Sequence, residues 1–317
     1  MPTRSQLARS ERIHRRTGRT FYLATRMFPR RIRHATYVLY AFFRVADDVV
    51  DTTEPKPKPV QRARLEHIRD AVLGRAETDE PVLLANRDLL EKYDIDDAEV
   101  ERFIDAMISD IDHEPYESRA ELDAYMRGSA VAVAHMMLEV MEAPEPERAK
   151  PHAAALSEAF QLTNFLRDVR EDIREYGRVY LPGETREAFA ITLDQLEAGE
   201  ADAGFRRGMQ VELARTEERY RMGVAGIRHL PEDTQFAVLV SAVLYADYHR
   251  AIVAQNYDVL AERPSLSPWR KLSLLARTRF HWALSRDPVA VFDRVATIDE
   301  TDHLDIEPLP PAQTPIQ

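Results

Sequence analysis

Apolar residues recur at intervals of three and four along almost the whole chain of 317 residues. This spacing is typical of amphipathic helices, whereas the strict alternation that marks half-buried strands is nearly absent. Only ten glycines interrupt the pattern, so the chain offers few positions for tight turns. The sequence therefore predicts an all-α protein.

Proline-rich breaks separate the expected helices at residues 55–59, 143–146 and 181–183. The expected helices cover residues 3–16, 31–53, 59–77, 83–93, 97–111, 119–142, 149–175, 203–228, 232–261, 267–282 and 287–295. The length would allow one or two domains, but no break is long enough to be a clear interdomain linker. We therefore predict one helical domain over residues 1–297, followed by a loose tail over residues 298–317 that is polar and rich in proline.

Charge and cysteine content exclude several classes of function. The net charge of −11 repels phosphate backbones, so nucleic acid is not an expected partner. The absence of cysteine rules out disulfides, thiolate zinc sites and cysteine nucleophiles. Five lysines stand against thirty-eight arginines, a bias that resembles acidic proteins of salt-loving archaea but would also follow from a GC-rich genome.

The amino terminus has charges spaced through it and lacks the continuous apolar segment of a secretory signal. The longest apolar run, residues 236–246, is far shorter than the roughly 20 residues that a bilayer span requires. A cytoplasmic location is therefore expected, and peripheral contact with a membrane stays open.

An acidic motif, Tyr-Ala-Phe-Phe-Arg-Val-Ala-Asp-Asp-Val-Val-Asp, occupies residues 40–51. Residues four apart share a face of a helix, so Asp47 and Asp51 form a carboxylate pair. Their neighbours are apolar nearly all round, which predicts a buried helix rather than a solvated charged face. Arg44, one turn earlier, is placed to hold a carboxylate or a phosphate oxygen.

A second motif, Gln-Leu-Thr-Asn-Phe-Leu-Arg-Asp-Val-Arg-Glu-Asp, occupies residues 161–172. Asn164, Asp168 and Asp172 follow one another at helical spacing, with Gln161 one turn earlier and Arg167 alongside. Taken alone, this row would also fit a solvated polar stripe.

The two motifs together point to a metal-bridged site for a diphosphate. Like charges at four-residue spacing destabilise a helix, and carboxylates among apolar residues are costly unless cations neutralise them. Mg2+ is a hard ion that takes oxygen ligands of this kind. The metal ligands predicted in this way are Asp47, Asp51, Asn164, Asp168 and Asp172.

The strings Y-A-F-x-R-x-x-D-D-x-V-D and Q-L-T-N-x-x-R-D-V-x-E-D resemble the two signatures of the squalene and phytoene synthase family of head-to-head prenyl transferases. The likeness covers roughly residues 15–280. It extends to residues 20–22, 121–125, 177–182 and 256–258, and to Arg263, Arg270 and Lys271.

The resemblance implies an all-α isoprenoid-synthase fold, a single helical bundle around a central cavity. It also implies that Asp47, Asp51, Asp168 and Asp172 act in catalysis by holding Mg2+, with Mn2+ as an alternative ion. The residues similar to the family's diphosphate-binding residues are Thr20, Arg44, Gln161, Asn164, Arg167, Arg178 and Arg263. Phe21, Tyr40 and Tyr245 match aromatic positions near the reacting carbons, where a ring face stabilises a cation. Surface cations are the alternative for Arg178 and Arg263, and core packing is the alternative for the aromatic residues.

The activity implied is condensation of two geranylgeranyl diphosphates to phytoene, through a cyclopropylcarbinyl diphosphate and without NADPH. The string at residues 178–182 resembles the phytoene branch. Squalene or dehydrosqualene synthesis from farnesyl diphosphate is the alternative within the family. A non-catalytic relative that serves as a binding or assembly protein is the alternative from another class, and a plain acidic scaffold is a third. His135, on a helix of small residues, is predicted to be a satisfied core histidine rather than a base.

Overall fold

The computed structural model describes residues 2–52 and 54–296, and every regular element in them is helical. The all-α prediction is thereby confirmed, while the predicted tail at 298–317 lies outside the described residues. The helices are α1 (Arg4–Thr17), α2 (Arg19–Thr25), α3 (Arg30–Val50), α4 (Lys58–Val72), α5 (Pro81–Tyr93), α6 (Asp97–Ser109), α7 (Arg119–Met126), α8 (Ala132–Met141), α9 (Pro146–Glu171), α10 (Gly183–Ala188), α11 (Leu193–Ala198), α12 (Ala203–Ala225), α13 (Glu232–Ala254), α14 (Pro268–Leu284) and α15 (Pro288–Val295).

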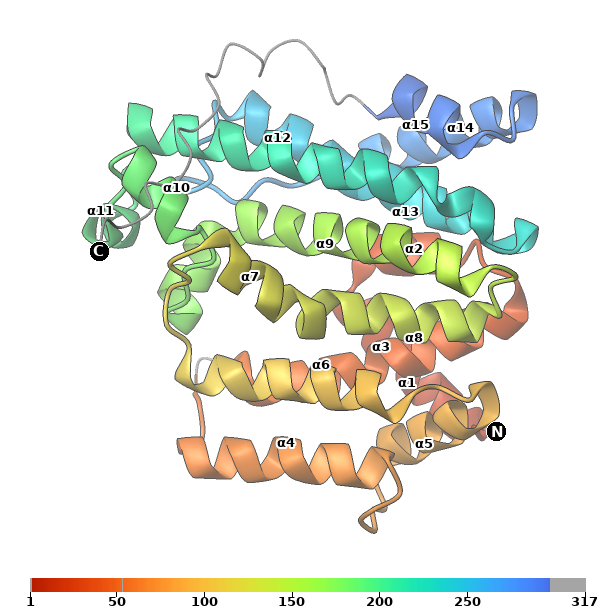
Figure 1. Cartoon of the computed structure of the whole chain (residues 1–317). Coiled ribbons are helices and arrows are strands. Elements are labelled where there is room, and N and C mark those ends of the chain that lie inside the picture. The colour runs from red at the N-terminus through yellow and green to blue at the C-terminus, as the bar shows by residue number, and fades with distance from the viewer. Residues whose placement is uncertain (1, 53, 297–317) are drawn as a thin grey trace.

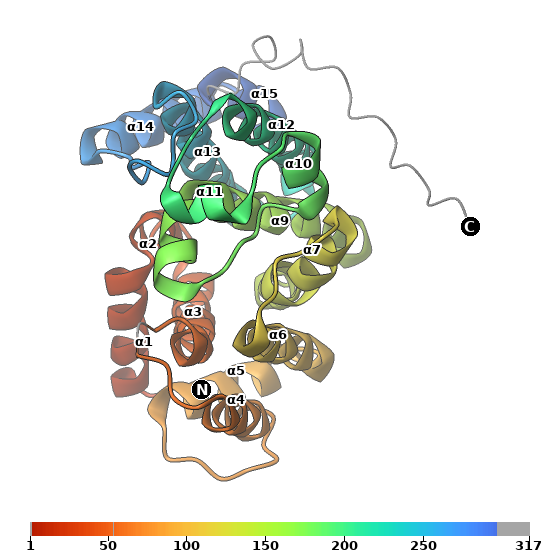
Figure 2. The ribbon, with the colours of Figure 1, turned by 90° about the vertical axis from the view of Figure 1, so that its left-hand side faces the viewer.

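The long helices lie side by side in layers (Figure 1). Viewed at right angles, α1 to α3 stand on one side, α6 and α7 stand opposite, and α9 lies between them and the layer of α12 and α13 (Figure 2). The contacts agree, because α9 packs against α8, α12 and α13, and α3 packs against α1, α5 and α6. Helix α9 therefore belongs to the centre of the assembly.

Helix α13 forms much of the core. It begins directly after Pro231, with Glu232 and Asp233 favourably placed in its first turn. By length and composition it could cross a membrane, but 72% of its most apolar 18-residue stretch is buried inside the protein. The prediction extended this helix to residue 261, whereas it ends at Ala254 because Asn256 and Tyr257 adopt left-handed backbone angles with φ of 51° and 60°.

Three short helices, α2, α10 and α11, were not predicted, because one or two turns carry too little periodicity to be recognised. Two predicted helices contain wider turns. A π-helical segment (Arg127–Val131) joins α7 to α8, and another (Asp172–Tyr176) follows α9. Such turns are frequent at functional sites, and both lie beside the cavity described next.

Candidate active site

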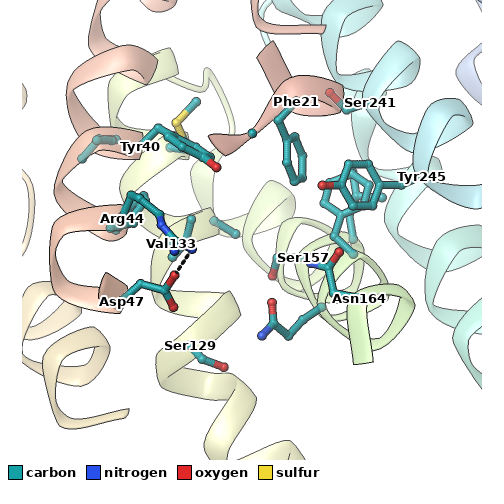
Figure 3. Close-up of a pocket in the computed structure, with 18 of the residues that line it drawn as sticks. Phe21, Tyr40, Arg44, Asp47, Ser129, Val133, Ser157, Asn164, Ser241 and Tyr245 are labelled. Atoms are coloured by element: carbon teal, nitrogen blue, oxygen red, sulfur yellow. Dashed lines mark hydrogen bonds and ion pairs between the residues drawn. The ribbon is translucent and has the colours of Figure 1, made fainter. Parts of the chain in front are cut away.

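A cavity of about 580 Å3 lies among α2, α3, α8, α9 and α13, within the usual volume range of small-molecule sites. Figure 3 shows Arg44 and Asp47 on one wall, on α3, and Asn164 on the facing wall, on α9. Phe21 and Tyr245 project into the same space from α2 and α13. The two motifs from distant parts of the chain thus line a single cavity.

The first acidic motif ends α3. Asp47 lies in the last turn, and Asp51 caps the helix with its backbone N–H donating to the Asp47 carbonyl. Arg44 donates to Asp47 Oδ2 at 2.5 Å and reaches Asp48 at 2.6 Å. Asp47 and Asp51 line the cavity, whereas Asp48 does not and is mostly exposed. Only the pair predicted to share a face is therefore available to a ligand.

The second motif forms the facing wall. Gln161, Asn164 and Asp168 line the cavity from α9, and Asp172 lines it from the first position of the π turn. Two arginines donate hydrogen bonds to the Asp168 carboxylate. Arg167 Nε and Nη2 lie 2.7 and 2.5 Å from its oxygens, and Arg263 Nε and Nη2 lie 2.7 and 2.9 Å away.

Arg178 joins the two walls. The π turn and the left-handed Gly177 (φ 66°) bring the chain back, so that the Arg178 N–H donates to the Asp172 carbonyl at 2.9 Å. The buried Arg178 guanidinium then pairs with Asp51 at the end of α3 and donates to the Val50 carbonyl at 3.2 Å. The predicted surface alternative for Arg178 is therefore wrong, since the side chain is buried.

Negative charge accumulates between the walls. Burial raises the pKa of Asp47 well above its usual value, and the Asp51 carboxylate raises it further. Burial also raises the pKa of Asp172, and so do the charges of Asp168 on the same wall and Asp51 on the opposite one. Carboxylates of α3 and α9 thus repel one another across the cavity, which is the electrostatic setting that attracts a cation.

The aromatic residues predicted near the reacting carbons lie on the cavity wall. The ring centroids of Phe21 and Tyr245 are 4.3 Å apart, and Phe160 lies within 5.3 Å of both. Tyr40 stacks on the buried ring of His14 at 3.9 Å. Burial keeps the pKa of Tyr245 well above its usual value, so the ring stays neutral and presents an intact π face.

Thr20 is the one predicted site residue that is not on the cavity wall. It is buried behind the wall, where it accepts a hydrogen bond from Lys271 Nζ at 2.9 Å and lies 3.3 Å from the Tyr248 hydroxyl. His135 has a hydrogen-bond partner as predicted, because its Nδ1 lies 3.0 Å from Glu99 Oε1, but its side chain is half-buried and not in the core.

Among the wall residues that sequence reasoning missed are Asp110 and Tyr125. Tyr125 donates to Asp110 Oδ2 at 2.9 Å, and both side chains line the cavity. Burial raises the pKa of Asp110 to about 7, although Arg178 and Tyr125 lower it in part. Tyr125 belongs to the segment 121–125 that resembles the family, and this was the available signal, whereas Asp110 had none.

Oxygen donors for a divalent cation are present, and arginines pair with three of them, Asp47, Asp51 and Asp168. Within the described ranges no three His, Cys, Asp or Glu side chains converge as a ready metal cage. The side chains that could hold a cation are those of Asp47, Asp51, Asn164, Asp168 and Asp172.

Away from the carboxylates the cavity wall is largely apolar. Part of its wall is built by large apolar side chains of Phe28, Leu39, Met107, Met137, Met141, Leu156, Ile227, Leu230 and Val238. Such a compartment holds a hydrocarbon chain and keeps water from the reacting carbons.

Comparison with known proteins agrees with this geometry. Residues 14–270 match the family described as squalene/phytoene synthase. The chain is 32% identical to the 15-cis-phytoene synthase of Synechococcus elongatus over 278 residues, which cover 83% of this chain and 89% of the relative. It is 31% identical to the phytoene synthase of Thermus thermophilus over 268 residues, which cover 84% and 90%.

The solved structures of a dehydrosqualene synthase and of a squalene synthase from Alicyclobacillus acidocaldarius are also similar. The first gives a TM-score of 0.80 at 26% identity and covers 89% of this chain and 98% of that one. The second gives 0.71 at 26% identity and covers 80% and 95%. The isoprenoid-synthase fold predicted from the motifs is confirmed, and the chain belongs to the squalene/phytoene synthase family.

Proposed function

We propose that the protein is a phytoene-forming prenyl transferase that joins two geranylgeranyl diphosphates head to head and releases both diphosphates. One observation carries the proposal: the carboxylates of α3 and α9 face each other across a cavity whose remaining wall is largely apolar. The relatives named phytoene synthase support the choice of a C20 substrate.

A divalent cation fits the site. The cavity is lined by six carboxyl side chains and by four arginines, so the carboxyl groups outnumber the local positive charges. Burial, and then neighbouring carboxylates, raise the pKa values of Asp47 and Asp172. Bound Mg2+, or Mn2+ in its place, would supply the positive charge that makes diphosphate a better leaving group. Asp47, Asp51, Asn164, Asp168 and Asp172 would hold it.

The arginines already at the walls are suited to bind the phosphate oxygens. Each of four arginines pairs with a wall carboxylate: Arg44, Arg167, Arg178 and Arg263. These guanidinium groups could exchange the carboxylate for a diphosphate oxygen by side-chain movement alone. Gln161 supplies a further amide donor from α9.

The bond changes follow from this arrangement. The C–O bond of the first substrate breaks, its diphosphate leaves, and the double bond of the second substrate attacks the allylic cation. Loss of one proton closes a cyclopropylcarbinyl diphosphate, which loses its own diphosphate, rearranges and gives up a second proton. No hydride is consumed, so NADPH is not required. Phe21, Tyr40 and Tyr245 present ring faces that stabilise the cations, and the apolar wall excludes water.

Squalene-type or dehydrosqualene-type chemistry on farnesyl diphosphate is the second candidate. The structural similarity to a dehydrosqualene synthase and a squalene synthase favours it specifically. The proposal also places the protein in the cytoplasm, with peripheral contact to a membrane that holds its apolar substrate and product.

The test mixes purified protein and Mg2+ with either geranylgeranyl or farnesyl diphosphate, with and without NADPH. The hydrocarbon products are identified by mass spectrometry. We expect a C40 hydrocarbon with a conjugated triene at its centre from the C20 substrate without NADPH. Asp168→Asn should lower the rate by about 10^2 or more, because Asp168 lines the cavity. Asp48→Asn is the matched control and should keep the wild-type rate, because the exposed Asp48 carboxylate does not line the cavity.

Product from farnesyl diphosphate alone would assign the protein to the C15 branch. Full activity of the Asp168→Asn variant would refute the site, and failure to release diphosphate from either substrate would refute the enzyme.

A further inference from the structure

Helix α14 exposes large apolar side chains that the active site does not use. Trp269 is 80% exposed, Leu272 54%, Phe280 61% and Leu284 69%. At 100° per residue these four positions fall on one side of the helix, opposite the buried Leu274, Thr278 and Trp282. The inner face of α14 packs on α13 and α15, and no other element in the described part of the chain covers the outer face.

The charge around this apolar face is opposite to that of the whole protein. Between residues 263 and 286 there is no Asp or Glu, although the chain carries a net charge of −11. The same stretch carries six bases. Arg263, Arg270 and Lys271 bind Asp168, Asp247 and Thr20 of the protein itself, so the basic charge beside the outer face comes from Arg277, Arg279 and Arg286. Arg279 and Arg286 are exposed, with their guanidinium groups against the rings of Phe236 and Trp282.

The position of α14 relates it to the cavity. Arg263, just before the helix, lines the cavity and pairs with Asp168. Lys271, in the first turns of α14, donates to Thr20 on α2 directly behind the cavity wall. The helix is about 25 Å long at 1.5 Å per residue, and Figures 1 and 2 show it at the edge of the assembly, away from α4.

We propose that the outer face of α14 docks on the surface of an anionic lipid bilayer. Aromatic and aliphatic side chains on one face with arginines beside them are the pattern of helices that lie in the membrane interface. The basic flanks complement anionic headgroups, and the screening length of about 8 Å in physiological salt limits repulsion from acids elsewhere on the protein. A second copy fits less well, because the two faces would bring basic flanks together.

This inference rests on the proposed function, since a membrane would be the source of the C20 substrate and the destination of the C40 product. Docking through α14 would bring Arg263, which lines the cavity just before this helix, close to the lipid surface.

The two tryptophans provide the assay, because Trp269 is exposed and Trp282 is 1% exposed. Full-length protein is mixed with vesicles of phosphatidylcholine alone or with an equal amount of phosphatidylglycerol, at fixed KCl. We expect binding to the anionic vesicles by sedimentation, with a blue shift of tryptophan emission that Trp269→Phe abolishes. The double variant Leu272→Ser/Phe280→Ser should bind at least about tenfold more weakly. Arg279→Gln/Arg286→Gln should lose about fivefold per charge, on anionic vesicles only.

Val60→Ser is the matched control, an exposed apolar residue of α4 at the opposite end of the protein, and it should bind as the wild type does. Each variant is first melted to show that it is folded. Absence of binding, or an equal loss in Val60→Ser, overturns the proposal. So does a blue shift that grows with protein concentration without vesicles, which would assign the face to a second copy.

The Asp168→Asn variant separates this inference from the proposed function, because it should bind vesicles fully while lacking activity. Vesicle binding by a protein without any prenyl transfer would leave the surface in place and refute the function. Prenyl transfer by a protein that does not bind vesicles would support the function and refute the membrane-docking surface.

Discussion

The ion pair between Arg178 and Asp51 gives a quantitative test of the site. The Arg178 side chain is 7% exposed and that of Asp51 is 20% exposed, whereas Arg263, one of the two arginines on Asp168, is 50% exposed. Replacing Arg178 by Gln leaves Asp51 without its partner, close enough to Asp172 for the two carboxyl groups to repel each other.

Breaking a buried pair from one side costs about 3–5 kcal/mol, and the cavity exposure of Asp51 places the Arg178→Gln variant at about 3 kcal/mol. For a chain of this size each kcal/mol lowers Tm by about 2 °C, so the expected drop is about 6 °C. Arg263→Gln breaks a half-exposed pair worth about 0–1 kcal/mol, so its Tm should fall by about 2 °C at most.

The assay is differential scanning calorimetry at neutral pH without divalent cations, with prenyl transfer measured separately. Arg178→Lys keeps the charge but not the bond to the Val50 carbonyl, so it should recover most of the Tm. Both Gln variants should lose activity, because both arginines are proposed to bind diphosphate. A Tm for Arg178→Gln within 1 °C of wild type, or an equal drop in Arg263→Gln, would show that burial of the pair does not govern its contribution.

Three further predictions concern the cavity. Ala153→Phe should shift the preference from C20 to C15 diphosphate, because a ring at this lining position shortens the space for the prenyl chain. The neighbouring Ala154 is not on the wall, so Ala154→Phe should leave the preference unchanged. Competition between the two substrates measures the shift. Tyr245→Phe should keep most of kcat, whereas Tyr245→Leu should lower kcat by about tenfold or more, because the ring face is proposed to stabilise the cation. Equal kcat values for the two variants would exclude this role of the ring. The pKa of Asp110 is raised to about 7, so the folded state retains a proton that the unfolded chain loses above about pH 4. This group therefore lowers the free energy of unfolding by up to about 4 kcal/mol as the pH rises to 7. In urea unfolding the free energy should fall less steeply with pH in Asp110→Asn than in the wild type, and identical pH dependences would contradict the prediction.

The secondary structure and the acidic walls could be predicted because their signals are local. Helical spacing alone put Asp47 with Asp51 on one face and Asn164 with Asp168 on another, and all four line the cavity. Asp172 also lines it, although a π turn replaces the last α turn that was expected there. The role of Thr20 could not be judged in this way, because its contact with Lys271 joins residues 251 apart in sequence.

By itself the sequence determined that the chain is helical, which residues share a face of each helix, and, through two motifs, the family. Only the tertiary structure decided which faces meet. It joined Arg178 to Asp51, added Asp110 and Tyr125 to the cavity wall, and turned the Trp269 side of α14 to the solvent. The physical reason is that backbone periodicity acts over a few residues, whereas burial depends on which apolar faces pack together across the whole chain.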